Sequence, residues 1–225
     1  LIGANIIVVV GGQKGGSGKS TVAINLAVQA VAASTDLLLI DADPQGTMSD
    51  WVNLRIKNGH SHITCVQRRG AALGQDLVEL NAKYEMVIVD CDGRSSESQI
   101  AAMSVADKMF IIVQPSTPDI WTLAVMKQLH DAIKPINPKL NVSVVFNMVS
   151  TNANDSDFRD AVESVKEFYP EFNVFPYPIK SRKGFKNAFA MGLGISEMKD
   201  SADSVQSGAL EIRRLSKNIS SINKA

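Results

Sequence analysis

Short apolar runs alternate along the chain with longer stretches in which apolar residues recur every three or four positions. The runs predict buried β-strands, and the longer spacing predicts amphipathic helices. Strands are predicted at 5–10, 37–41, 62–66, 85–90, 108–113, 140–147 and 173–177. Helices are predicted at 19–33, 47–57, 73–82, 95–105, 118–134, 155–168, 182–192 and 200–219. This alternation predicts an α/β fold with a mostly parallel, twisted sheet and helices on both faces.

The predicted strands end in polar residues at several places. The first leads into a glycine-rich loop, and three others end at Asp41, Asp90 and Asn147. Ligands of open α/β sheets bind outside the carboxyl ends of the strands, so these residues predict one shared site. Because no long linker or internal repeat interrupts the pattern, we expect residues 1–225 to form a single domain.

Composition adds a charge asymmetry. The 225 residues include 23 Lys+Arg and 23 Asp+Glu, so the formal net charge is zero. Residues 180–225 contain nine Lys/Arg and four Asp/Glu, a local charge of +5 that leaves −5 for the rest. A basic final quarter indicates an anionic partner. Cys65 and Cys91 lack metal-site spacing, and no signal peptide or membrane-length apolar run is visible, so we expect a cytoplasmic protein.

The loop after the first predicted strand reads Gly12-Gln13-Lys14-Gly15-Gly16-Ser17-Gly18-Lys19-Ser20-Thr21. Glycines allow backbone N–H groups to turn inward, and a following helix N-terminus attracts anions, so this context predicts a phosphate-binding loop. A dinucleotide-binding loop fits less well, because Thr21 stands where that motif has its third glycine. The expected phosphate ligands are Gly15, Gly16, Ser17, Gly18, Lys19, Ser20 and Thr21. Lys19 is expected at the β- and γ-phosphates, and the Ser20 hydroxyl at Mg²⁺.

The strict phosphate-loop pattern fails at Gln13, and a lysine follows it. Lys14-Gly-Gly-Ser-Gly-Lys19-Ser20 resembles the deviant Walker A loop of the ParA/MinD ATPases. The resemblance implies a P-loop NTPase fold, ATP and Mg²⁺ as cofactors, and an ATP-dependent homodimer in which Lys14 reaches the partner's nucleotide. It extends from Ile6 to about Ser216 and is greatest for small plasmid-partition ParA proteins of the ParF type.

Aspartates occur after the glycine loop at positions where this family has its conserved aspartates. Asp41 and Asp43 lie 22 and 24 residues after Lys19, as in the family's Walker A′ segment. The resemblance implies that Asp41 acts near the metal and that Asp43 orients the attacking water. Asp90 ends a Walker B-like strand and is expected in the Mg²⁺ shell. The predicted catalytic residues are therefore Lys14, Lys19 and Asp43, and the predicted metal ligands are Ser20, Asp41 and Asp90.

The chain departs from the family pattern after Asp90, where Asp92 replaces a proline. Arg94 then either pairs with Asp92, reaches a phosphate, or forms a surface ion pair. The segment 111–119 resembles the family's dimer face or switch region and receives no catalytic role.

Two further residues are expected beside the adenine base of ATP. Asn147 resembles the family's strand-ending asparagine, whose amide would pair with the adenine edge, unless it only closes a turn. Pro178, in the loop 175–179, would cover the base.

The basic residues of the final quarter form either a solvated charged face or, as the resemblance implies, a DNA-binding surface, which a dimer would double. Its expected members are Arg182, Lys183, Lys186, Arg213, Arg214 and Lys217. The resemblance implies a plasmid or chromosome partition ATPase, associated with the nucleoid of a bacterium or archaeon. Its ATP-bound dimer would bind DNA without sequence preference, and a centromere-binding adaptor of the ParB/ParG kind would stimulate slow hydrolysis and release it.

Three alternatives remain. A MinD-like membrane switch would use the tail from Leu210 to Ala225, although this tail lacks bulky aromatic residues and association with a membrane is not expected. A ParA-like positioner of a protein cargo would have the same ATPase. A reductase of the nitrogenase iron-protein type would need two suitably placed cysteines per chain, and Cys65 lies in a poorly matching region.

Overall fold

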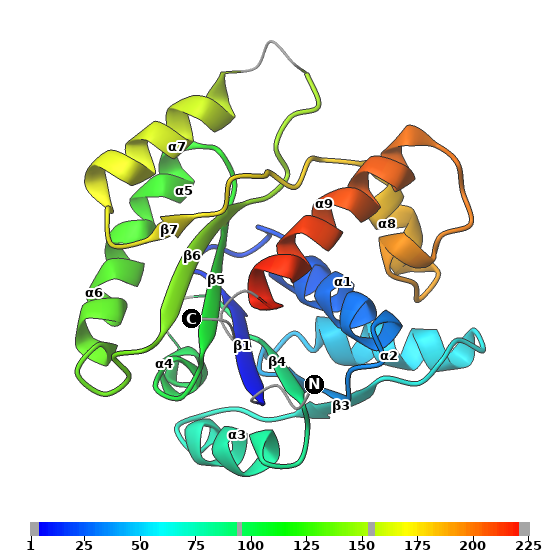
Figure 1. Cartoon of the computed structure of the whole chain (residues 1–225), viewed down its shortest axis with the longest axis horizontal. Coiled ribbons are helices and arrows are strands. Elements are labelled where there is room, and N and C mark those ends of the chain that lie inside the picture. The colour runs from blue at the N-terminus through cyan, green and yellow to red at the C-terminus, as the bar shows by residue number, and fades with distance from the viewer. Residues whose placement is uncertain (1–4, 94–95, 153–155, 221–225) are drawn as a thin grey trace.

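The computed structural model describes residues 5–93, 96–152 and 156–220, and Arg94 lies outside them. All seven predicted strands occur in one parallel sheet, in the order β3-β2-β4-β1-β5-β6-β7 (Figure 1). Their bounds are β1 Ile6–Gly11, β2 Leu37–Asp41, β3 Thr64–Gln67, β4 Met86–Asp90, β5 Lys108–Val113, β6 Asn141–Phe146 and β7 Asn173–Val174. The predicted fold class is confirmed.

Helices connect the strands, as predicted, with a few changes. Their bounds are α1 Lys19–Ala32, α2 Thr47–Lys57, α3 Leu73–Asn81, α4 Glu97–Met103, α5 Thr117–Trp121, α6 Leu123–Ile133, α7 Asp157–Phe168, α8 Lys183–Ala190 and α9 Asp203–Ser220. A 3₁₀ turn, η1 (Ile195–Glu197), was not predicted. The single helix predicted at 118–134 is divided at Thr122. Within the described residues, no helix has both the length and the apolarity needed to cross a bilayer.

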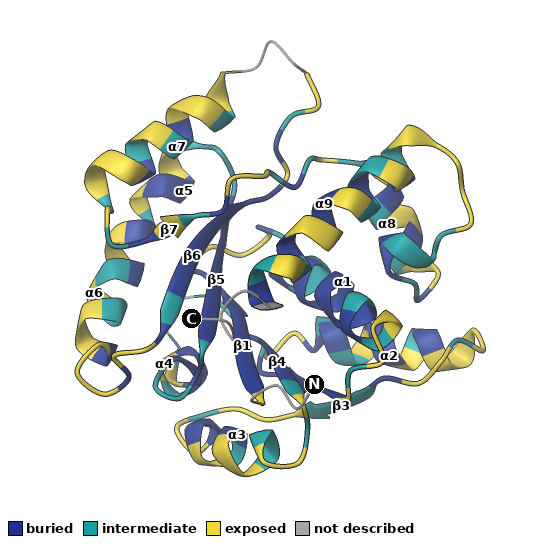
Figure 2. Cartoon of the chain, in the orientation of Figure 1, coloured by how far each residue is buried: buried dark blue, intermediate teal, exposed yellow. Residues whose placement is uncertain are grey.

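The helices cover the sheet on both faces and create two apolar cores (Figure 2). Helices α1, α2, α8 and α9 enclose one core, which contains Trp51, Phe110 and Leu215. Helices α3 to α7 enclose the other, which contains Leu77 and Phe146. Strands between two such layers are apolar on both faces, which explains why their sequences are nearly continuous apolar runs.

The strand register brings separate segments of the sequence to one edge of the sheet. β4 lies between β2 and β1, with Asp41 opposite Asp90 and Asp90 opposite Val10. The loop that follows β1 therefore begins beside the two aspartates, and the predicted site is assembled at the carboxyl ends of the central strands.

Candidate functional site

The loop between β1 and α1 holds a conformation that depends on glycine at its last position. Gly18 precedes α1 with a φ of 88°, and a Cβ there would lie 2.3 Å from Nδ2 of Asn147. No side chain caps the first turn of α1, so its backbone N–H groups remain available to an anion. The local geometry is therefore that of a phosphate-binding loop.

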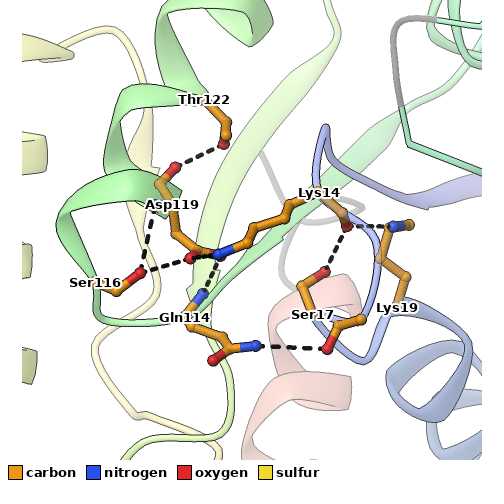
Figure 3. Close-up of polar contacts among 8 residues, drawn as sticks. Lys14, Ser17, Lys19, Gln114, Ser116, Asp119 and Thr122 are labelled. Carbon is orange, nitrogen blue, oxygen red and sulfur yellow. Dashed lines mark hydrogen bonds and ion pairs between the residues drawn. The ribbon is translucent and has the colours of Figure 1, made fainter.

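Lys19 is held against the loop by a backbone contact. Its Nζ donates a hydrogen bond of 2.9 Å to the carbonyl of Lys14, and the Ser17 hydroxyl lies 3.4 Å from the same oxygen (Figure 3). Lys19 is only 6% exposed, so its ammonium is positioned at the first turn of α1 with little access to water. A phosphate in the loop would meet this charge together with the free amides of α1.

The side chain of Lys14 turns away from the loop and contacts α5. Its Nζ lies 2.5 Å from Oδ2 of Asp119, whose side chain is buried, whereas that of Lys14 is 45% exposed (Figure 3). Asp119 also accepts hydrogen bonds from the Ser116 hydroxyl at 2.6 Å and from the backbone N–H of Gln114 at 3.2 Å. Burial alone would raise the pKa of Asp119, but the hydrogen bonds from Lys14 and Ser116 hold it below its usual value.

Asp41 and Asp90 form a buried pair of carboxylates beside the loop. Asp41 accepts hydrogen bonds through Oδ2 from the backbone and hydroxyl of Ser49, at 2.8 and 2.7 Å. Its Oδ1 and both carboxylate oxygens of Asp90 lack a well-formed hydrogen bond among the described residues. Burial raises the pKa of Asp90 to about 7, against the influence of the Ser20 hydroxyl.

Two buried carboxylates with unused oxygens suit a hard divalent cation, because the cation supplies the charge compensation that the protein lacks. Ser20 begins α1 on the same side, and its hydroxyl interacts with Asp90. The residues present therefore fit Mg²⁺, with Ser20, Asp41 and Asp90 as the side chains that would hold it or its waters.

Asp43 lies in the turn after β2 and is more accessible than Asp41. Its Oδ1 accepts a hydrogen bond of 2.8 Å from the Gln45 backbone, which holds the carboxylate at the rim of the site. The two aspartates of this segment thus differ in environment: Asp41 is buried, whereas Asp43 is partly exposed.

A cavity of about 450 Å³ opens beside the loop and α1. It is lined by Asn147, Thr21, Ile179 and Phe185 among others, so it joins polar groups to an apolar wall that suits a base. Asn147 donates a hydrogen bond of 2.8 Å from Nδ2 to the Ser17 carbonyl and so fastens the loop. Pro178, by contrast, is absent from the lining, although its neighbour Ile179 belongs to it.

The six predicted DNA-binding residues fall into two groups. Arg182 is largely buried and pairs with Glu211 at 2.9 Å and Asp203 at 3.3 Å. The other five are exposed on α8 and α9, which pack against each other. They are Lys183, Lys186, Arg213, Arg214 and Lys217. Arg214 lies over the ring of Tyr177, 4.6 Å from its centroid.

Sequence reasoning missed two polar residues that shape the site. Asp119 holds Lys14, and its place in the first turn of α5 follows from the Ser116 cap, a signal that the sequence does contain. Gln99 accepts a hydrogen bond of 3.0 Å from the Gly12 backbone through Oε1. No local sequence pattern predicts this contact, because Gly12 and Gln99 lie 87 positions apart.

The parallel sheet, the glycine loop and the paired carboxylates define the class of P-loop nucleotide-binding proteins. A model of the CobQ/CobB/MinD/ParA nucleotide-binding domain matches residues 8–195. The chain belongs to this family, as its resemblance to the ParA/MinD ATPases implied.

Known relatives include a carboxysome distribution protein and a ParA protein. The chain is 30% identical over 209 residues to "Maintenance of carboxysome distribution protein A" of Gloeobacter kilaueensis, covering 86% of this chain and 85% of that one. It is 26% identical over 195 residues to "Protein ParA" of Rhizobium radiobacter, covering 86% of each chain.

Solved structures share the fold. The ATP complex of a Cyanothece McdA variant superposes with a TM-score of 0.79 at 17% identity, covering 97% of both chains. MinD of Pyrococcus horikoshii with Mg-ADP superposes with a TM-score of 0.72 at 16% identity, covering 96% of both. These likenesses show the shared fold, and the family model shows that the chain contains a nucleotide-binding domain.

Proposed function

We propose that this protein is an ATPase with Mg-ATP as its cofactor, and that it drives the partition of a plasmid or chromosome through an ATP-dependent homodimer that binds DNA without sequence preference. The observation that carries the proposal is Lys14, an additional, half-exposed lysine at the mouth of the phosphate loop. One lysine, Lys19, suffices for the phosphates of its own chain. A second lysine held by a breakable contact at the surface has the reach to act on a neighbouring chain.

The residues of the site divide the work of hydrolysis. Lys19 and the loop amides bind the phosphates, while Ser20, Asp41 and Asp90 would hold Mg²⁺, which would supply neutralising charge at the phosphates. Asp43 orients the attacking water. Lys14 of the partner neutralises charge on the transferring phosphoryl group, because phosphoryl transfer depends mainly on positioning and charge stabilisation. Asn147 supports the loop and lies beside the base, and Pro178 lies next to the cavity wall.

The exposed basic residues of α8 and α9 supply the DNA contacts. Five cations on two packed helices form a surface that a two-fold dimer presents twice. Hydrolysis, stimulated by a centromere-binding adaptor, releases this dimer from the nucleoid.

Two alternatives are less well supported. Leu215 and Ile219 of α9 are buried in the core, so they are not available for insertion into a membrane, and Ile222 lies outside the described residues. Cys91 is fully buried, whereas a cluster shared between two chains needs thiols at the surface where the chains meet.

A second candidate function is the positioning of a protein cargo on the nucleoid. The 30% identity to a carboxysome distribution protein favours it, and its ATPase cycle would be the same. Adaptor dependence distinguishes the two functions. A partition ATPase should be stimulated most by an adaptor bound to its centromere DNA, whereas a cargo positioner should be stimulated by an adaptor carried on the cargo.

DNA binding with ATP, ADP or no nucleotide, across a salt series, tests the shared part of the cycle. We expect binding only with ATP, falling steeply with salt because the contacts are to phosphates. Equal binding in all three states would contradict gating by the nucleotide. No binding in any state would favour the membrane switch, for which liposome pelleting with ATP is the next measurement.

A further inference from the structure

The buried carboxylate of Asp41 is held on one side by a single residue, Ser49. The backbone N–H and the hydroxyl of Ser49 both donate hydrogen bonds to Oδ2 of Asp41, at 2.8 and 2.7 Å. Asp41 is fully buried, and its Oδ1 lacks a well-formed hydrogen bond among the described residues. The two oxygens therefore differ: Oδ2 is engaged by the protein, and Oδ1 is left for a cation or for its waters.

The contact comes from the first turn of α2. Gly46 precedes this helix and supplies no side-chain cap, so the amides of the first turn need another acceptor. Asp41 accepts the amide of Ser49, the third residue of α2, in the way that an N-cap side chain would. The positive end of the helix also stabilises the negative charge of the carboxylate. Asp41 is thus fixed to α2 as well as to the end of β2.

A third element limits the orientation of the Ser49 hydroxyl. Helix α2 packs against β2 and β3 (Figure 1), and Sγ of Cys65 on β3 lies 3.9 Å from Oγ of Ser49. Because the hydroxyl proton is given to Asp41, the lone pairs of Oγ are free to accept from the weak thiol donor. Ser49 is therefore placed between Cys65 and Asp41, with its proton directed at the carboxylate.

Asp90 has no comparable support. Both of its oxygens lack a well-formed hydrogen bond among the described residues, and it lies opposite Asp41 in the sheet. Two buried carboxylates at this separation repel each other when both are charged. The two donors of Ser49 offset part of that repulsion, because hydrogen bonds to an ionised acceptor are the stronger kind. They also fix the side chain of Asp41 before any cation arrives.

We propose that Ser49 is a positioning residue for the metal site, which orients Asp41 so that Oδ1 stays available to Mg²⁺ or to its waters. Ser49 does not itself bind the metal in this assignment. Residues that hydrogen-bond a metal-binding side chain commonly change metal affinity by about 10- to 100-fold. The inference rests on the proposed function, because it assigns Ser49 a role at the site where Mg²⁺ would bind.

Nucleotide binding with and without the metal provides the test. The dissociation constant of a fluorescent, non-hydrolysable ATP analogue is measured for the full chain in excess EDTA and in saturating Mg²⁺. The value in EDTA reports the phosphate loop alone. By linkage, the ratio of the two constants reports how much more tightly Mg²⁺ binds the nucleotide on the protein than in solution.

Three substitutions of Ser49 separate a metal role from a structural one. In Ser49→Ala we expect the constant in EDTA to stay as in the unmodified chain, while the ratio falls by about tenfold. Ser49→Thr keeps the hydroxyl and should restore the ratio. Ser49→Cys keeps the volume but donates weakly, so its ratio should lie between those of the other two.

Ser104→Ala is the matched control. Ser104 is half-buried like Ser49, and its hydroxyl donates a hydrogen bond of 2.7 Å to the Ala101 carbonyl, away from the metal site. This variant should lose a hydrogen bond without any change in the ratio. Urea midpoints of all variants measure the effect of each substitution on folding.

Two results would overturn the inference alone. An unchanged ratio in Ser49→Ala would show that the hydroxyl does not position Asp41. An equal weakening of binding in EDTA and in Mg²⁺ would assign Ser49 to the fold rather than to the metal site. By contrast, an unmodified chain that binds the analogue in neither condition would contradict the proposed function, and this inference with it.

Discussion

The proposed action of Lys14 on a neighbouring chain requires Lys14 to leave its contact with Asp119. The contact is suited to release, because Asp119 keeps its hydrogen bonds from Ser116 and Gln114 when Lys14 departs. Lys14 is itself half-exposed, so water can solvate its ammonium as it moves. A partly exposed ion pair contributes up to about 1 kcal/mol, which corresponds to about a fivefold change in an equilibrium.

Asp119→Asn tests this restraint. The substitution keeps the shape of the side chain but removes the charge that holds Lys14, so we expect ATP-dependent dimerisation to strengthen by up to about fivefold. Sedimentation with ATP measures the dimer dissociation constant. Asp131→Asn, which breaks the exposed pair between Asp131 and Lys127, is the matched control. An unchanged constant in Asp119→Asn would show that the pair does not restrain Lys14.

Lys14→Ala tests the lysine itself. Because Lys19 and the α1 amides remain, we expect ATP binding by the single chain to persist, while dimerisation and dimer-dependent hydrolysis are lost. Equilibrium binding of labelled ATP and phosphate release at several protein concentrations measure the two properties. Unchanged dimerisation and ATPase activity in this variant would refute the role across the dimer.

At the scale of elements, Arg55 joins α2 to the segment after α8. Its guanidinium forms two hydrogen bonds of 2.8 and 2.7 Å with Glu197 and one of 3.0 Å with the Gly192 carbonyl, and it lies over the Trp51 ring. Arg55 is 1% exposed, so its charge depends on these partners. The pair connects residues 142 positions apart and fixes how α2 meets η1.

Removal of this connection should be costly. We expect Arg55→Ala to lower the free energy of unfolding by about 3 kcal/mol, because it leaves buried acceptors unpaired and removes a packed side chain. Urea denaturation followed by circular dichroism measures the change. In the control Arg68→Ala, which breaks an exposed pair of 3.6 Å with Asp76, the loss should stay below about 1 kcal/mol. Equal losses in the two variants would mean that the buried network of Arg55 contributes no more to the free energy of unfolding than an exposed ion pair.

The same pair predicts a dependence on pH. Burial would raise the pKa of Glu197, but hydrogen bonds from Arg55 and the Gly194 backbone lower it below its ordinary value. A depressed carboxyl pKa stabilises the fold above the pKa of the unfolded chain, and this contribution is lost as the pH falls through the folded value. The stability difference between the unmodified chain and Glu197→Gln should therefore be largest near neutral pH and shrink in acid. A constant difference in urea midpoints from neutral pH into acid would contradict it.

Sequence patterns predicted the elements well where local chemistry decides them and poorly where distant contacts do. All seven strands follow from apolar runs, but β7 ends at Val174 rather than 177, because Pro176 cannot donate to a ladder and the strand lies at the edge. The division between α5 and α6 depends on Thr122, whose hydroxyl bonds the Asp119 carbonyl at 2.6 Å. The Lys14–Asp119 pair spans 105 positions, so no local pattern contained it.

At the scale of the whole molecule, zero net charge conceals a separation of charge between two surfaces. A surface groove between α5 and α7 is lined by Asp157 and Asp160, whereas α8 and α9 expose five cations. The sequence predicted the excess positive charge of residues 180–225, but it could not show which of those cations are free. Arg182 forms ion pairs with Glu211 and Asp203. This pairing results from the packing of α8 against α9, so the sequence alone does not predict it.

This distinction predicts different effects on DNA binding. Each exposed cation that contacts a phosphate adds about 0.9 to the slope of log affinity against log salt. Lys186→Ala/Arg213→Ala should therefore lower that slope by about two per protomer, measured by anisotropy with labelled duplex DNA, ATP and about 50 to 200 mM salt. Arg182→Ala should leave the slope unchanged and instead lower the urea midpoint, because it leaves Glu211 buried without its partner. If Arg182→Ala reduces the slope and Lys186→Ala/Arg213→Ala leaves it unchanged, the DNA binds to a different part of the surface.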